Sequence, residues 1–218
     1  MTFGEMQALT SYWLDDLNFG YFTTTQVKVW LNNAQKRLQR RLLKAGENYY
    51  VECAETTLVV NQREYVLPDD FLKLHRLELI ISGTSPNETK TPIKPITMNQ
   101  QDMAQTGSGT PYCYFIKKNR LVLFPAPDTA LTLRLNYSYL ITDMVSDSDV
   151  ADAPDQYQEM IPLLAAEDGF IKDGRTPELL VKKIQEFGIE TDQDADERTQ
   201  DQPRGIVETG NSNGGYFW

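Results

Sequence analysis

Histidine and cysteine are scarce in this chain, which leaves little material for nucleophilic or metal chemistry. His75 is the only histidine, and Cys53 and Cys113 are the only cysteines. A zinc site needs three or four His or Cys ligands at regular spacings, and neither cysteine has the flanking motif of a Cys–His nucleophile. We therefore expect no catalytic residue, no metal and no cofactor. Two cysteines in unrelated contexts also indicate a reduced, cytosolic assembly environment.

Long apolar runs and excess positive charge are missing as well. No stretch approaches the roughly 20 apolar residues that cross a bilayer, and the first ten residues lack the basic and apolar regions of a secretory signal. The net charge is −10 and the pI about 4.6. Nucleic-acid-binding domains usually carry a basic footprint. We therefore expect no membrane segment and no specific DNA binding.

Two further site types are excluded by their sequence patterns. The segment Gly107–Pro111 lacks the lysine and the strand-to-helix context of a phosphate-binding loop. The aspartates between residues 143 and 155 lack the central glycine and closing glutamate of a calcium loop.

Helical periodicity is present at both ends of the chain. Apolar residues at helical spacing predict a first helix over 5–17, through Met6, Leu9, Trp13 and Leu17. A threonine cap at 24 or 25 and Gly46 bound a second helix that ends near Ala45. A third helix is predicted from Tyr157 to Ile171. Thr176 and Pro177 open a fourth helix, which ends at Gly188 or continues toward Arg198.

The middle of the chain shows the alternating pattern of strands instead. Polar turns, prolines and period-two apolar residues separate the segments. The predicted elements are a hairpin of 57–60 with 64–67, a strand over 72–81, long loops over 82–110, a hairpin of 112–116 with 121–124, and a strand over 131–139.

This order of elements predicts an α+β protein, in which an α-helical bundle carries an inserted antiparallel β subdomain. The two N-terminal and two C-terminal helices form the bundle from residues 1–48 and 142–190. Residues 49–141 form the β subdomain, and residues 191–218 form an extended C-terminal arm.

The second helix has an apolar stripe and a basic face on opposite sides. The stripe consists of Val27, Leu31, Ala34, Leu38 and Leu42, and the basic face of Lys36, Arg37, Arg40, Arg41 and Lys44. The face is either a solvated surface or an electrostatic contact with an acidic surface, in this chain or in a neighbouring copy. The acidic segment 186–208 is a candidate complement for it in either place.

The tail from about residue 192 has the composition of an unfolded chain, yet it ends with three aromatic residues, Tyr216, Phe217 and Trp218. Burying each aromatic side chain is worth roughly 2–3 kcal/mol, against a large ordering cost for a glycine-rich arm. The tail is either a disordered end or an arm that docks onto a partner or adjacent subunit. We favour the arm, and include Ile206 and Val207 in its docking residues.

An ordered series of short motifs resembles the head-to-tail adaptor (connector) proteins of tailed bacteriophages, of the tubular or gatekeeper type. The motifs cover roughly residues 20–190 and are Val27–Ala34, Tyr65–Phe71 with Leu74–Leu77, Gly109–Tyr112 leading into Leu121–Pro127, Asn136-Tyr137, and Ala153–Tyr157.

The resemblance implies a structural virion component that assembles in the host cytoplasm as a ring, typically a dodecamer, beneath the portal protein. The next tail component, a nozzle or tail tube, would lie beyond it, and DNA would pass through the lumen without specific binding. The arm would reach the portal, and the basic face would be an inter-subunit electrostatic surface. The hydrophobic content of 40% suits a protomer that completes its burial against neighbours. Two rival functions remain open, an accessory protein that binds one partner and a tail-borne peptidoglycan hydrolase.

Overall fold

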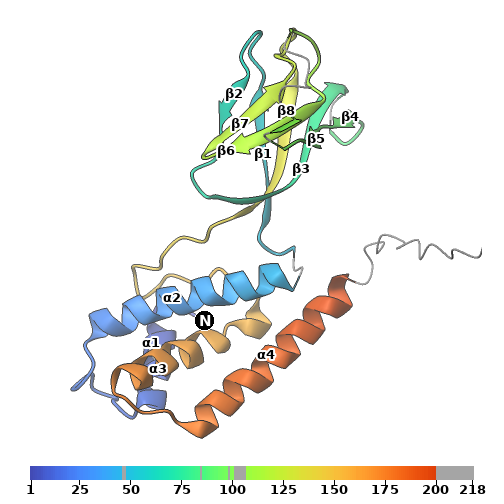
Figure 1. Cartoon of the computed structure of the whole chain (residues 1–218). Coiled ribbons are helices and arrows are strands. Elements are labelled where there is room, and N and C mark those ends of the chain that lie inside the picture. Colours follow the sequence, from blue (N-terminus) through green and yellow to red (C-terminus); the bar gives the residue numbers. More distant parts are fainter. Residues whose placement is uncertain (46–47, 84, 98, 101–106, 200–218) are drawn as a thin grey trace, which may run out of the picture. The chain divides into compact units, whose positions relative to one another are not determined.

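The computed structural model describes residues 1–45, 48–83, 85–97, 99–100 and 107–199. The chain divides into two compact units, one from residues 1–47 and 144–218 and the other from residues 48–143 (Figure 1). The first unit is helical and the second is built from strands, so the α+β class with helices at both ends of the sequence is confirmed. No helix in the described part of the chain is long and apolar enough to cross a membrane.

The helical unit contains α1 (Phe3–Leu14), α2 (Thr24–Lys44), α3 (Met160–Lys172) and α4 (Glu178–Thr199), with a 3-10 turn, η2 (Asp155–Tyr157), before α3. Threonine side chains begin the first two helices. Thr2 and Glu5 form a reciprocal capping box on α1, and Thr23 and Gln26 form another on α2. The predicted stripe of α2 is confirmed, because all five of its side chains have zero solvent exposure.

Helix α1 differs from its prediction in position and in its buried face. It ends at Leu14, where Asp15 adopts a left-handed conformation, so Leu17 lies outside the helix and is exposed. Three polar residues, Gln7, Thr10 and Ser11, occupy the buried face, and the hydroxyls of Thr10 and Ser11 donate hydrogen bonds to the carbonyls of Met6 and Ala8. Short hydroxyl side chains can be buried in this way because the helix backbone satisfies them.

Helix α4 continues through Gly188 to Thr199, so residues 191–199, which were assigned to the extended arm, are helical. Gly188 is buried, and a methyl group there would lie 2.4 Å from a terminal nitrogen of Arg41. A glycine inside a helix costs about 1 kcal/mol relative to alanine. In α4 the glycine leaves room for the Arg41 guanidinium instead of ending the helix.

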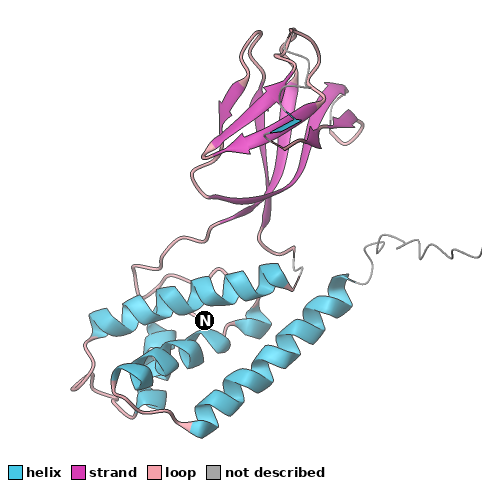
Figure 2. Cartoon of the chain, viewed as in Figure 1, coloured by secondary structure: helices cyan, strands magenta, loops and turns pink. Residues whose placement is uncertain are grey.

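The β unit consists of two four-stranded sheets (Figure 2). One has the order β1-β8-β3-β4 and the other β2-β7-β6-β5. The strands are β1 (Val51–Thr57), β2 (Glu64–Val66), β3 (Phe71–Ser82), β4 (Thr89–Pro92), β5 (Lys94–Pro95), β6 (Cys113–Lys117), β7 (Arg120–Phe124) and β8 (Thr132–Tyr139). All pairs are antiparallel except β5 with β6.

Both sheets contribute to one apolar core, as in a sandwich of two sheets. Leu77 and Leu79 from β3 and Leu133 and Leu135 from β8 pack in the same cluster as Leu121 and Leu123 from β7. The expected strand over 72–81, the strand over 131–139 and the β6–β7 hairpin are confirmed. The expected first hairpin is wrong, because β1 pairs with β8 and β2 with β7, in different sheets. The region 82–110, expected as loops, contains the short strands β4 and β5.

The chain enters and leaves the β unit at neighbouring positions. Strand β1 pairs with β8 along its whole length, from Val51 opposite Ser138 to Thr57 opposite Thr132. The Tyr139 amide donates to the Tyr50 carbonyl at 3.1 Å, immediately outside the paired segment. These contacts hold Tyr50 and Tyr139, near the two ends of the unit, side by side.

Candidate functional site

The residues with the greatest catalytic or metal-binding potential do not converge. His75 lies exposed on β3, where its Nε2 is 2.5 Å from the Ser138 hydroxyl. Cys53 is exposed on β1, and Cys113 is buried on β6 in the other sheet. Burial raises the pKa of each thiol, which opposes the thiolate form that a nucleophile or metal ligand needs. Within the described ranges, no three His, Cys, Asp or Glu residues form a group able to hold a metal ion.

The basic face of α2 is the most distinctive charged feature of the helical unit, and its five residues do not behave alike. Arg37 is engaged within the chain by α3. Its guanidinium lies 3.3 Å from Glu167 Oε2 and 3.0 Å from Asp168 Oδ2, and it donates to the Leu164 carbonyl at 2.6 Å. Arg37 therefore joins α2 to α3.

The acidic partner Asp168 is only partly solvated. Burial raises the pKa of the Asp168 carboxyl, and the neighbouring Arg37 opposes this by stabilising the ionised form. The Nε atom of Arg37 is itself buried without a hydrogen-bond partner. This part of the basic face is thus an internal polar contact, which desolvates charge on both helices.

Arg41 is engaged by α4. Its Nε and Nη2 lie 3.1 and 2.9 Å from the two carboxylate oxygens of Asp192, a bidentate pair. The guanidinium also lies against the backbone at Gly188. Asp192 belongs to the acidic segment 186–208, so for Arg41 the complement is found in the same chain.

Arg40 and Lys44 remain without an acidic partner in the described part of the chain. Both side chains are exposed, and the one hydrogen bond of Arg40 is from its Nε to the Lys36 carbonyl at 3.2 Å. Lys44 lies in the last turn of α2, where a cation is favoured by the helix dipole. The helix dipole does not in the same way account for the exposed cation of Arg40.

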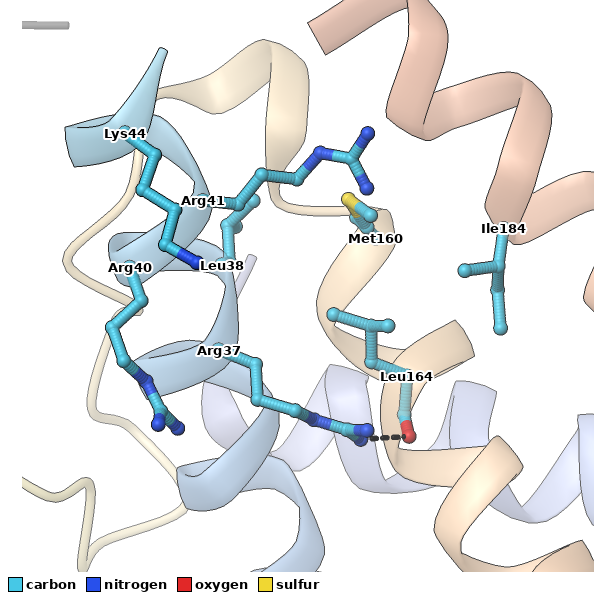
Figure 3. A pocket seen from close by; sticks show the side chains of 8 residues that line it. All are labelled: Arg37, Leu38, Arg40, Arg41, Lys44, Met160, Leu164 and Ile184. Carbon is cyan, nitrogen blue, oxygen red and sulfur yellow. Dashed lines mark hydrogen bonds between the residues drawn. The ribbon is translucent and has the colours of Figure 1, made fainter. Parts of the chain in front are cut away.

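A pocket of about 400 Å³ opens between α2, α3 and α4, and we call it the basic pocket (Figure 3). Its cationic side is formed by Arg37, Arg40, Arg41 and Lys44. Its apolar side is formed by Leu38, Met160, Leu164 and Ile184. Such a pocket suits a group that combines a carboxylate or other anion with an aliphatic side chain.

The residues that carry the resemblance mostly hold the fold together. The Asn32 side chain on α2 exchanges two hydrogen bonds with the Met144 backbone, at 3.0 and 2.9 Å. The Tyr65 hydroxyl binds the backbone of Val59 and Gln62, and the Tyr137 hydroxyl donates to Asp70. These three side chains therefore stabilise the fold.

The predicted docking residues of the arm, Ile206, Val207, Tyr216, Phe217 and Trp218, lie outside the described residues. Sequence reasoning missed Glu167 and Asp168, because only the apolar spacing of the third helix was considered. Their position one helical turn beyond Leu164 was the available signal, since it places acidic groups beside the apolar face.

Comparison with known proteins gives one clear result. The family model described as SU10 adaptor protein matches residues 1–210. No curated protein matches the chain.

Proposed function

The chain belongs to the SU10 adaptor protein family, and we propose that it forms the head-to-tail adaptor ring of a tailed phage. A phage adaptor is a structural component of the virion that interacts with other head and tail components. The finer assignment is that this protein bridges the portal and the next tail component, and that DNA passes through the lumen of its ring. The family match over nearly the whole chain is the observation that carries this proposal.

Exposed apolar side chains on the helical unit support the proposal that the protein buries part of its surface against other copies of itself. Leu179 and Ile189 on α4 are 85% and 57% exposed, and Tyr12 on α1 is 66% exposed. Single exposed apolar residues are common, but here they accompany cations without acidic partners on α2. A heterologous contact joins two unlike surfaces of identical copies. Repeating it forms a closed ring when the rotation between neighbouring copies divides a full turn evenly.

The charge of the chain supports passage of DNA without binding. Protein–DNA affinity comes largely from lysine and arginine contacts to phosphate, and this chain has a net charge of −10. A lumen of the same sign as the phosphates does not hold DNA.

The test is co-assembly of the purified chain with the portal protein of the same phage, followed by negative-stain imaging and mass measurement. We expect a closed multimer with rotational symmetry on the portal. A complex with one copy of the chain, or no complex at high concentration, contradicts the proposal and favours an accessory protein. Clearing of peptidoglycan in a zymogram would support the hydrolase instead.

A further inference from the structure

We propose that the basic pocket receives the segment Gly205–Glu208 of a second copy of this chain, with Ile206 against Ile184 and Glu208 at its cations. The inference rests on the proposed function, because it names the contact that joins neighbouring copies.

The pocket has two chemical requirements. Leu38, Met160 and Leu164 are almost fully buried, whereas Ile184 is partly exposed at the pocket, so the occupant must supply an apolar side chain to cover Ile184. The rim offers positive charge, so the occupant must also supply an anion. A volume of about 400 Å³ falls within the range of ligand pockets, about 300–1,000 Å³.

The surplus positive charge is localised on two side chains. Arg37 and Arg41 already have carboxylate partners on α3 and α4. Arg40 and Lys44 have none among the described residues, although they belong to an acidic chain in which carboxylates outnumber cations by 31 to 21. They are therefore available to an incoming carboxylate.

One segment beyond α4 meets both requirements. After Thr199, Ile206 and Val207 are the only aliphatic residues of the sequence other than glycine and proline, and Glu208 follows them directly. Gly205 precedes them and carries no side chain to hinder close approach of the backbone. An extended strand alternates its side chains, so Ile206 and Glu208 would face one way.

A second copy fits the pocket better than the same chain. The Arg41–Asp192 pair fixes α4 beside the pocket, and α4 continues seven residues further to Thr199. At 1.5 Å per residue this places the start of the segment roughly 10 Å farther along the helix axis. An arm that entered the pocket of its own chain would have to reverse direction within residues 200–205, and we therefore assign the segment to a second copy.

Two full-length variants test the inference. The pocket variant carries Arg40→Glu with Lys44→Glu, and the arm variant carries Ile206→Asp with Val207→Asp. We expect each to be monomeric alone in analytical ultracentrifugation and an equimolar mixture to form a heterodimer, because one contributes an intact arm and the other an intact pocket. A mixture that stays monomeric overturns the inference.

A peptide of residues 201–210, labelled with fluorescein, gives a direct binding measurement on the arm variant. Adding Arg40→Glu and Lys44→Glu to that variant should raise the dissociation constant at least about tenfold. Adding Lys94→Glu and Lys117→Glu, two exposed lysines of the β unit, makes the same change in net charge and should leave it unchanged. Equal losses in both variants overturn the inference, as does binding of a labelled oligonucleotide in place of the peptide.

The two proposals fail separately. If the pocket variant forms a normal ring with the portal, the pocket contact is wrong and the adaptor role stands. If the wild-type chain never forms a closed multimer with the portal, the adaptor role itself is wrong.

Discussion

The pKa of His75 links the stability of the β unit to pH. It lies on β3 beside Ser138, and desolvation, with a smaller contribution from Lys73, lowers the pKa of its imidazole below 6.5. A histidine whose folded-state pKa is lowered binds its proton less well in the native protein than in the unfolded chain. Stability is then lost as the pH falls below the unfolded value.

Because the chain has one histidine, its titration can be followed without assignment. We expect the imidazole proton signals in an NMR titration to give one transition with a midpoint below 6.5. The free energy of unfolding should fall between pH 7.5 and 5.5, and His75→Gln should remove the contribution of this group to that fall. A midpoint above 6.5 would show that the imidazolium is stabilised instead.

Gly169 on α3 permits close packing of three helices. A methyl group at this position would lie 2.6 Å from Leu14 Cδ2 of α1 and 3.2 Å from Trp30 Cζ3 of α2. Both distances are shorter than ordinary van der Waals contact. The glycine is therefore required by tertiary packing, against its low helix propensity.

We expect Gly169→Ala to destabilise the protein, because overpacking costs about 1–3 kcal/mol and the gain in helix propensity is only about 1 kcal/mol. Urea unfolding of the single variant measures the net effect. In a Leu14→Ala background the shorter of the two contacts is removed and only that to Trp30 remains, so the same glycine substitution should become clearly less destabilising. Equal effects in both backgrounds would rule out the packing explanation.

At the scale of the element, α2 combines two kinds of basic residue on one face. Arg37 connects α2 to α3 through Leu164, Glu167 and Asp168, while Arg40 is exposed and has no acidic partner among the described residues. One part of the basic face therefore stabilises the fold, and the other part is exposed and can bind a partner.

Alanine substitutions separate these roles. Arg37→Ala leaves the partly buried Asp168 without its cation and removes the bond to the Leu164 carbonyl, so we expect a loss of about 1–3 kcal/mol. Arg40→Ala should change stability by less than about 0.5 kcal/mol. Chemical denaturation at pH 7 compares the two, and a large loss in the Arg40 variant would show that it too holds the fold.

The stripe of helix α2 was predictable because it is uniformly apolar, but the expected cap at Thr24 or Thr25 is wrong, because Thr23 caps the helix. The buried face of helix α1 was not predictable from its apolar residues. Thr10 and Ser11 are buried whereas Leu9 is only half-buried, so the apolar residues do not mark the buried face.

The pairing of β1 also could not be predicted from the sequence. Local alternation shows that a strand exists, but its partner β8 lies about 80 residues away in the chain. The cations of the pocket were identifiable by helical spacing, whereas its apolar wall depends on how α3 and α4 pack.

At the scale of the whole molecule, the β unit is one continuous segment with its own core. The cluster that includes Leu79, Leu123 and Leu133 is built entirely from residues 58–137. The contact between Tyr50 and Tyr139 holds the two ends of the segment together. We propose that this segment is an autonomous domain inserted into the helical bundle.

A fragment of residues 48–143 should therefore fold alone. We expect a strand-type circular dichroism spectrum and a cooperative thermal transition. A fragment without a cooperative transition would show that the helical unit is needed for its stability.

The aromatic end of the chain belongs to the same scale, because its expected partner is another protein. We expect deletion of Tyr216–Trp218 to weaken portal docking while leaving the melting temperature within about 2 °C, since the tail has the composition of an unfolded chain. Affinity for immobilised portal, measured with wild type as the control, tests the first part. Unchanged affinity would reject the role of the aromatic end.

Since the backbones of Tyr50 and Tyr139 are hydrogen-bonded to each other, residues 50–139 can be exchanged as a block at two adjacent cut points. Such an exchange leaves the capping boxes, the stripe of α2 and the Asn32–Met144 bonds in place. A phage lineage could acquire a different β unit by recombination at these points and retain its helices unaltered. The helical and β units are thus free to diverge at different rates.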